Sequence, residues 1–194
     1  MTQETTSQIQ TDQKQIKDYL EEIRMPALRK NVLHLYDDIE EKLKANPASI
    51  KYHHNYPSGL YIHTLEVMRF ALEFFEMYKE KMVRYFTRDD VILVAFIHDL
   101  EKIKKYKKNQ SQNAGISEPH FTYNYGKLDM NDSTEVVNLI GRYGVHLTDL
   151  QVNALVLHMG GWSVDRGKLT ELAALMHVAD LMSTNFGQKQ QNGG

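Results

Sequence analysis

Apolar residues recur at helical spacing along most of this 194-residue chain. Leu28, Val32, Leu35 and Ile39, for example, fall on one face of a helix. Pro26 is expected to close the first helical segment, because proline cannot continue a helix. The pattern predicts an all-α fold with short links and one long loop, and its seven helices are expected over residues 16–23, 28–43, 60–86, 89–107, 133–142, 148–159 and 169–184.

Two features of the pattern add detail to this helical fold. Residues 91–97 are apolar on every face of their predicted helix, as a helix at the centre of a core would be. Thr87 precedes this helix as an N-cap residue and is followed by two aspartates in the first turn. Thr148 and Gln151 form a capping-box pair at the start of a later helix.

Residues 109–125 break the helical pattern, because they are rich in Asn, Gln, Ser and Gly and include a proline. They are expected to form an ordered loop or lid with a short extended piece at 120–125. The chain ends carry few apolar residues, so residues 1–15 and 186–194 are predicted to be flexible tails. Residues 16–185 then form a single domain, which the length of the chain favours.

The composition excludes several kinds of function. The chain has no cysteine, which rules out disulfides, thiolate metal sites and a cysteine nucleophile. Its formal net charge of -2 gives no broad attraction for nucleic acid or anionic membranes, so phosphate binding needs local clusters of basic residues. The first residues lack the apolar stretch of a signal peptide, and the longest apolar run is too short to span a bilayer. We therefore expect a cytoplasmic protein with no membrane partner.

Three short stretches place histidine or aspartate inside segments that otherwise belong to a core. His98 and Asp99 directly follow the most apolar run of the chain, where a polar group is costly unless it is paired or coordinated. His63 and Asp180 lie in two other predicted helices. Two imidazoles and two carboxylates make a mixed nitrogen and oxygen ligand set, which suits Mn, Fe, Co, Ni or Zn better than Ca. A buried hydrogen-bonded network is the alternative explanation for these residues.

The order and context of these residues resemble the HD superfamily of metal-dependent phosphohydrolases. The resemblance rests on residues 59–64, Gly-Leu-Tyr-Ile-His-Thr, and on residues 98–102, His-Asp-Leu-Glu-Lys, which are especially similar to HD enzymes with nuclease or nucleotidase activity. It covers roughly residues 52–184 and implies an HD-type helical domain with a bound divalent ion of Mn, Co, Ni, Fe, Zn or Mg. HD enzymes with two metals usually carry a further histidine after the lid, and residues 127–132 contain none, so one site is favoured. The metal ligands implied by the family pattern are His63, His98, Asp99 and Asp180.

The resemblance also implies catalytic roles around the metal. The metal would activate a water molecule for attack on phosphorus, with Asp99 as a ligand in the reacting centre. Lys102 lies one turn after His98 and could bind the substrate phosphate. His158 matches a later family histidine and could donate a proton to the leaving oxygen or hold phosphate. The end of a helix before two glycines is an equally good explanation for His158.

Further residues are candidates for contact with the substrate. His54 precedes the motif helix, Lys105 belongs to the basic run after the HD pair, and Trp162 could stack on a base. The solvated end of a helix is the alternative explanation for Lys105 and its lysine neighbours. His177, one turn before Asp180, is expected to be a satisfied core histidine, with support of Asp180 as the alternative.

The leading hypothesis is a hydrolase that cleaves phosphoester or phosphoanhydride bonds of (deoxy)nucleotides with a metal-activated water. A lid at residues 109–125 favours such a compact substrate. The first alternative is a phosphodiesterase or exonuclease acting on short oligonucleotides or cyclic (di)nucleotides, because residues 59–63 also resemble HD exonucleases. The alternative from another class is a non-catalytic HD module that binds a nucleotide or a protein. The expected partner is a small phosphorylated molecule, and the sequence is compatible with an oligomer.

Overall fold

The computed structural model of the chain describes residues 14–109, 121–124, 131–160 and 167–187. Helices dominate these residues, and the only strands among them form one antiparallel pair, so the all-α prediction is confirmed. The elements in chain order are α2 (Ile16–Glu21), α3 (Pro26–Ala45), α4 (Gly59–Met77), α5 (Lys79–Met82), α6 (Arg88–Ile97), α7 (Lys102–Lys105), β1 (Tyr106–Lys108), β2 (Phe121–Tyr123), α8 (Asp132–Gly141), α9 (Asp149–Leu157) and α10 (Glu171–Phe186).

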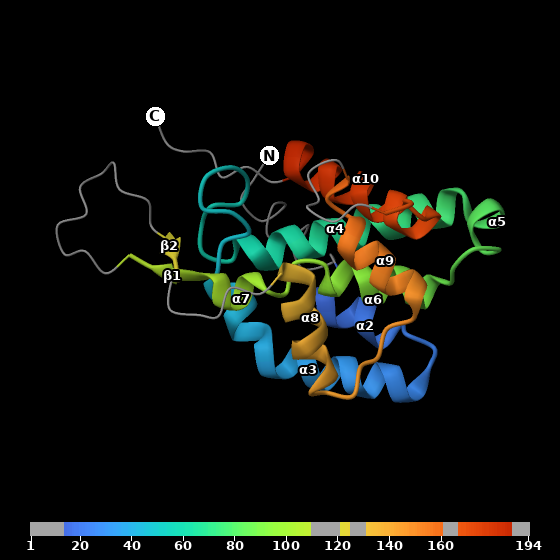
Figure 1. Cartoon of the computed structure of the whole chain (residues 1–194), viewed down its shortest axis with the longest axis horizontal. Coiled ribbons are helices and arrows are strands. Elements are labelled where there is room, and N and C mark those ends of the chain that lie inside the picture. The colour runs from blue at the N-terminus through green and yellow to red at the C-terminus, as the bar shows by residue number, and fades with distance from the viewer. Residues whose placement is uncertain (1–13, 110–120, 125–130, 161–166, 188–194) are drawn as a thin grey trace, which may run out of the picture.

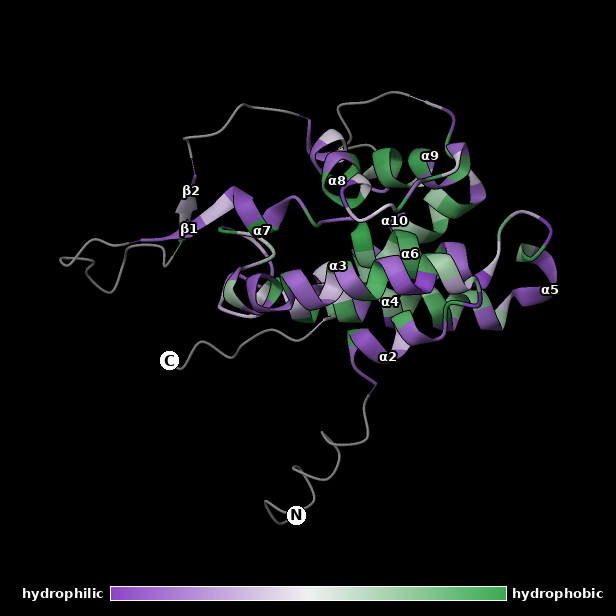
Figure 2. Ribbon diagram, turned by 90° about the horizontal axis from the view of Figure 1, so that it is seen from below, coloured by the Kyte–Doolittle hydropathy of each residue, from purple (hydrophilic) through white to green (hydrophobic). Residues whose placement is uncertain are grey.

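Helix α6 lies at the centre of the domain. It packs against α2, α4, α9 and α10, and the longest helix contact in the domain runs between α4 and α10 (Figure 1). Helices α2 and α3 cover the side opposite α10. Apolar residues are concentrated where α4, α6, α9 and α10 meet, while the outer side of α3 is hydrophilic (Figure 2). The start of α4, α7 and the strand pair lie at one end of the molecule in both views.

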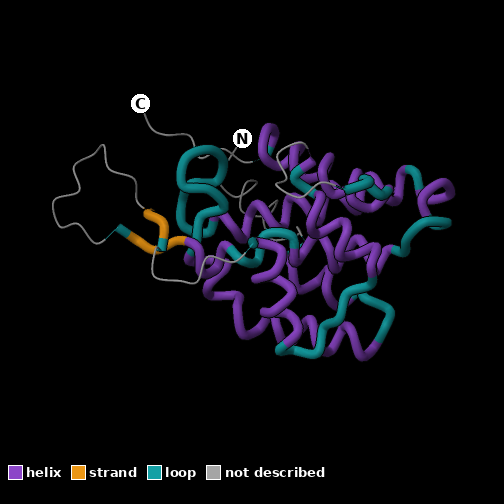
Figure 3. Tube along the Cα trace, in the orientation of Figure 1, coloured by secondary structure: helices purple, strands orange, loops and turns teal. Residues whose placement is uncertain are grey.

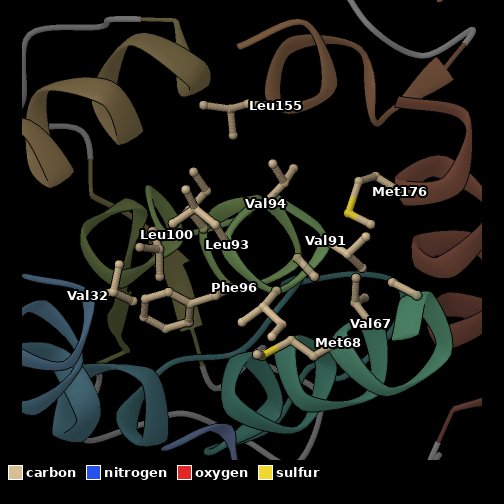
Figure 4. Close-up of a cluster of buried hydrophobic side chains, with 14 of the residues drawn as sticks. Val32, Val67, Met68, Val91, Leu93, Val94, Phe96, Leu100, Leu155 and Met176 are labelled. Atoms are coloured by element: carbon tan, nitrogen blue, oxygen red, sulfur yellow. The ribbon is translucent and has the colours of Figure 1, made fainter. Parts of the chain in front are cut away.

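The central position of α6 follows from its sequence. Every side chain from Val91 to Ile97 is fully buried, which confirms the prediction of a core helix. Side chains project from α6 in all directions to meet Val67 and Met68 of α4, Leu155 of α9 and Met176 of α10 (Figure 4). Burial of each such side chain contributes about 1.5–3 kcal/mol to folding. The last turn of α6 is therefore fixed firmly in the core.

The predicted helix starts are confirmed at two places. The Thr87 side chain accepts a hydrogen bond from the backbone N–H of Asp90, and Thr148 and Gln151 form a capping box before α9. Pro26 does not simply close the first helix, because it is the first residue of α3. This position tolerates proline, since the first helical N–H has no partner within the helix.

The helix predicted over residues 89–107 is wrong beyond Ile97. Residues 98–101 form turns in which the backbone N–H of Leu100 donates to the Ile97 carbonyl and that of Lys102 donates to Asp99. These bonds close tighter turns than those of an α-helix and redirect the chain. The chain then forms the single turn of α7 and continues into β1.

The helix predicted over residues 60–86 is also interrupted. Helix α4 ends at Met77, and Tyr78 leaves helical geometry at φ -114° and ψ 21° before the short α5. Met77, Val83 and Tyr85 are about half exposed or more, so this stretch buries no continuous apolar face. Without such a face, a long helix has little to hold it against the core.

The extended piece predicted at 120–125 is present as β2, whose Tyr123 pairs with Tyr106 of β1. The rest of the predicted loop or lid, at 110–120, and most of both predicted tails lie outside the described residues. Helix α10 continues to Phe186, the first residue of the predicted C-terminal tail. Within the described residues, no helix combines the length and apolar character needed to cross a membrane.

Candidate metal centre

Four polar side chains from three helical segments meet in the core. His63 lies in the second turn of α4, and Asp180 lies in the third turn of α10. His98 and Asp99 follow directly after the buried end of α6. His63 is fully buried, His98 and Asp99 are 3% and 5% exposed, and the Asp180 side chain is 14% exposed. The packing of α4 against α6 and α10 therefore brings together the four residues that the sequence analysis singled out.

Nε2 of His63 is the atom that the other three side chains approach, each with one atom. This nitrogen lies 3.2 Å from Nε2 of His98, 3.2 Å from Oδ2 of Asp99 and 3.3 Å from Oδ1 of Asp180. Nε2 of His98 in turn lies 3.3 Å from Oδ2 of Asp99. Nε2 of His63 thus lies within 3.3 Å of a potential ligand atom from each of the other three residues.

The tautomers of both histidines follow from their outer hydrogen bonds. Nδ1 of His98 lies 2.8 Å from the Ala95 carbonyl oxygen, which can only accept, so this nitrogen carries the proton. Nδ1 of His63 lies 2.9 Å from Oγ of Ser183, whose own hydroxyl donates to Glu66 at 2.8 Å, so Nδ1 of His63 must donate too. In their neutral forms, both imidazoles therefore direct an unprotonated Nε2 toward the centre.

This donor set fits a divalent metal ion. Two imidazole lone pairs and two carboxylate oxygens face one another, which is unfavourable unless a proton or a cation lies among them. Two ligand atoms that are each about 2.1 Å from a metal lie about 3.0 Å apart at a right angle and about 3.4 Å apart at the tetrahedral angle. The observed separations of 3.2–3.3 Å fall between these values. His63, His98 and Asp99 could thus hold one ion with little rearrangement, and Asp180, next to His63, could join them as a fourth ligand.

The charges of the cluster compensate for its burial. Burial lowers the pKa of His63, but hydrogen bonds to Asp180 and Asp99 outweigh burial and raise the pKa to about 9. Burial raises the pKa of Asp180, but the hydrogen bond and charge of His63 hold that pKa well below its usual range. The metal-free protein therefore satisfies the two carboxylates with a proton on His63.

Lys102 provides a second compensating charge. Its ammonium nitrogen lies 2.5 Å from Oδ2 of Asp99, the oxygen that also faces His63 and His98. Burial opposes ionisation of Asp99, yet the charges of Lys102 and His98 hold its pKa well below the usual value. The Lys102 side chain is 15% exposed, so its ammonium lies at the mouth of the cluster.

His158 lies beside the cluster and presents an unprotonated ring nitrogen, Nε2, as a hydrogen-bond acceptor. Its Nδ1 donates to the Leu155 carbonyl at 2.7 Å, so Nε2 is unprotonated, and that buried atom has no hydrogen-bond partner among the described residues. Its ring lies 5.4 Å from the His98 ring, and burial followed by the His98 charge lowers its pKa. His177 donates from Nδ1 to the His158 carbonyl at 2.7 Å and so links α10 to the end of α9 rather than bonding to Asp180.

Of the three predicted substrate-binding residues, His54 and Lys105 already have partners within the protein. Both ring nitrogens of His54 are engaged within the protein, with Glu66 and with His53. Lys105 pairs with Asp132 at 2.7 Å, and Trp162 lies outside the described residues. The ring of His53, the neighbour of His54, lies closer to His63: the two ring centres are 4.8 Å apart, against 5.4 Å for His54.

The sequence analysis missed Glu66, Ser183 and Glu101 as parts of the site. Glu66 follows His63 by one turn, and Ser183 follows Asp180 by one turn, so helical spacing was an available signal. Glu101 lies inside the His-Asp-Leu-Glu-Lys stretch and was given no role of its own. It is 5% exposed, and burial followed by the Asp99 charge raises its pKa to about 8.

No protein-family model matches the chain, and no solved structure matches it. Among curated proteins, it is 27% identical over 175 residues to the 3′–5′ exoribonuclease YhaM of Halalkalibacterium halodurans, covering 86% of this chain and 50% of that protein. Its identity to the 3′–5′ exoribonuclease YhaM of Oceanobacillus iheyensis is 24% over 176 residues, covering 85% of this chain and 50% of that protein. The chain thus spans about half the length of these exoribonucleases.

A shorter segment resembles an enzyme with a different substrate. Over 64 residues the chain is 36% identical to the dihydroneopterin 2′,3′-cyclic phosphate phosphodiesterase of Methanocaldococcus jannaschii, which is 33% of this chain and 26% of that protein. These similarities are consistent with an HD-type hydrolase and support, at a general level, a phosphohydrolase.

We predict that the metal-free protein loses stability as pH rises from about 6.5 to 9. A group whose pKa is raised on folding stabilises the fold below its unfolded pKa and loses this contribution as pH passes its folded pKa. For His63 that window runs from 6.5 to about 9, and for Glu101 it runs from 4.5 to about 8. The low pKa of His53, about 3, acts only below 6.5, so it does not oppose this trend.

The measurement is the Tm in the presence of a chelator across this pH range. The loss expected from His63 is on the order of 3 kcal/mol, or roughly 5–10 °C. The chelated His63→Gln variant should show a smaller fall, since only Glu101 then contributes. A wild-type Tm that stays level or rises between pH 6.5 and 9 would contradict this charge arrangement.

Proposed function

We propose that this protein is a metal-dependent phosphohydrolase that acts on phosphodiester bonds. The observation that carries the proposal is the set of contacts around Nε2 of His63, which lies within 3.3 Å of Nε2 of His98, Oδ2 of Asp99 and Oδ1 of Asp180. His63, His98 and Asp99 each offer a potential ligand atom within 4.8 Å of the other two. A cation that replaced the His63 proton would compensate both carboxylates, so the arrangement supports a resident divalent ion. Mn, Co, Ni, Fe, Zn and Mg are the candidate ions, at one site.

The side chains around the centre have complementary tasks in such a reaction. His63, His98, Asp99 and Asp180 would hold the ion, which when bound supplies a Lewis acid for a water molecule and a phosphoryl oxygen. Lys102, at the mouth, would bind a negatively charged oxygen of the phosphate. His158 would orient the attacking water, because its unprotonated Nε2 can accept a hydrogen bond.

The similar proteins favour a diester as the substrate. The similar proteins are a 2′,3′-cyclic phosphate phosphodiesterase and two 3′–5′ exoribonucleases, and each of these names denotes cleavage of a phosphodiester. We therefore place the diester ahead of the nucleotide phosphates that the sequence analysis favoured. Hydrolysis of nucleoside phosphates stays the second candidate, because the net charge of -2 lacks the broad basic surface of proteins that grip long strands. A non-catalytic binding module is the third.

Hydrolysis should prefer diesters to terminal phosphates. We expect a higher kcat/KM for bis(p-nitrophenyl) phosphate, a 2′,3′-cyclic nucleotide or a short single-stranded RNA than for nucleoside mono- and triphosphates, with Mn, Co, Ni and Mg compared in turn. A clear preference for the nucleotides would promote the second candidate. Binding without hydrolysis under every metal condition would support the non-catalytic module.

Metal content and turnover should disappear together in Asp99→Ala. The substitution removes one charged ligand, so we expect metal affinity to fall by more than about 100-fold and turnover to become undetectable. The helical circular dichroism should persist, because Asp99 lies after α6 rather than within it. Metal analysis after gel filtration and kcat on a diester provide the measurement. Full activity in this variant, or in thoroughly chelated wild type, would refute metal catalysis.

Lys102→Met should weaken phosphate binding and leave the metal in place. The methionine keeps much of the aliphatic stem but removes the charge, and a hydrogen bond to a charged group contributes about 1.5–3 kcal/mol. We expect kcat/KM for a diester to fall about 10–100-fold at unchanged metal content. Lys107→Met, on the exposed β1, is the matched control and should keep wild-type kinetics. Unchanged kinetics in Lys102→Met would leave Lys102 as a partner of Asp99 only.

A further inference from the structure

A buried chain of hydrogen bonds leads from the candidate metal centre to Glu66. This residue lies on α4 one turn after His63 and is 5% exposed. Its Oε2 atom accepts from the Ser183 hydroxyl at 2.8 Å and is 3.1 Å from Nε2 of His54. One carboxylate oxygen therefore joins two branches, and each branch ends on an imidazole at the centre.

The first branch fixes the tautomer of His63. Because Ser183 gives its proton to Glu66, its oxygen accepts the Nδ1–H of His63 at 2.9 Å. Nε2 of His63 is then left unprotonated toward the candidate ligands. Removal of the Glu66 acceptor would free the Ser183 hydroxyl to rotate and donate to Nδ1, which would stabilise the wrong tautomer of His63.

The second branch fixes the tautomer of His53 in the same way. Nε2 of His54 donates to Glu66, so Nδ1 of His54 is an acceptor, and it lies 3.2 Å from Nδ1 of His53. Nδ1 of His53 therefore carries a proton, and its Nε2 has a lone pair that no hydrogen bond among the described residues engages. The half-buried His53 ring lies 4.8 Å from the His63 ring, and one nitrogen each of His53, His54 and His63 lie within 4.8 Å of one another, so the His53 ring borders the centre.

The backbone is shaped to hold this arrangement. His54 has a φ of 47°, in the left-handed region that costs a non-glycine residue about 1–2 kcal/mol. Its carbonyl accepts from the Ala48 N–H at 3.1 Å and lies against Gly59, where a Cβ would come within 2.0 Å of it. The loop before α4, teal in Figure 3, therefore follows a defined path at the start of the helix.

A glycine also covers the other side of the Glu66 carboxylate. A Cβ at Gly187, just after α10, would lie 2.0 Å from Oε2 of Glu66 and 2.4 Å from the Ser183 carbonyl. Only glycine allows the chain to pass this close to both groups. The carboxylate is thus enclosed between the start of the motif helix and the end of α10.

We propose that Glu66 is a positioning residue that sets the tautomers of two imidazoles at the centre. Through Ser183 it holds His63 as a metal ligand, and through His54 it presents Nε2 of His53 as an acceptor for an O–H group at the reacting phosphate. The proposal rests on the metal site proposed above, but the tautomer of His63 can be measured without metal or substrate.

The test compares variants that cut one branch or both. Ser183→Ala cuts the His63 branch, His53→Phe removes the end of the other branch, and Glu66→Met removes the shared acceptor while filling its volume. Glu66→Gln keeps one oxygen at the shared position and should retain both hydrogen bonds. The matched control is Glu73→Met, on the exposed side of α4. Circular dichroism and Tm confirm that each variant folds.

Metal affinity is the first readout, by calorimetry with Mn or a competing chelator. We expect Ser183→Ala and Glu66→Met to bind metal about 10–100-fold more weakly, and Glu66→Gln and Glu73→Met to stay within about threefold of wild type. His53→Phe should bind metal like wild type and show a lower kcat/KM on a diester. Recorded above pH 9, where His63 is neutral, the imidazole ¹⁵N shifts of the metal-free protein should show His63 protonated on Nδ1 in wild type and lose that form in Ser183→Ala.

Two outcomes would overturn the proposal. Wild-type metal affinity and an unchanged His63 tautomer in both Ser183→Ala and Glu66→Met would show that the relay does not position His63. An equal loss in Glu66→Gln and Glu66→Met would show that the charge acts, rather than the shared acceptor. A wild-type protein that binds no metal yet shows the expected tautomer would instead refute the proposed function and leave the relay intact.

Discussion

The buried cluster of His63, His98, Asp99 and Asp180 is the constraint on which the rest of the domain depends. Nε2 of His63 and of His98 and the carboxylates of Asp99 and Asp180 meet where α4, α6 and α10 pack together. Such a cluster is unfavourable without a positive charge at its centre, because no water can solvate it there. A proton on His63 meets this demand in the metal-free protein, and a divalent ion would meet it more completely. Fold stability and metal binding are therefore linked at one position.

The packing of α6 makes this convergence possible. Its side chains are buried on every face, so the helix cannot rotate or shift without exposing apolar area (Figure 4). The helix ends at Ile97, but the backbone of His98 keeps right-handed helical angles, at φ -53° and ψ -33°. His98 and Asp99 therefore directly continue the buried end of α6, and its packing fixes where they lie.

The sequence predicts most of the helices and the residues that meet in the core, but not the connections between them. Periodicity predicts α6 as a core helix and predicts the caps at Thr87 and Thr148, because these depend on neighbouring residues only. The end of α6 at Ile97 depends on tertiary contacts, and propensity alone favours continuation through the following Leu, Glu and Lys. The partnership of Glu66 with Ser183, 117 residues apart, needs the packing of α4 on α10 to be known.

The charge of the cluster connects metal binding with substrate binding. Asp99 and Asp180 are ionised, and protonated His63 and the Lys102 ammonium supply two positive charges, so the group is close to neutral without a metal. A divalent cation that replaced the His63 proton would make the group net positive, and Oδ2 of Asp99, which Lys102 contacts, would be one of its ligand atoms. With that oxygen engaged, the Lys102 ammonium at the mouth gains most by pairing with an anion from outside. The same residues would therefore attract a phosphate more strongly once the ion is bound.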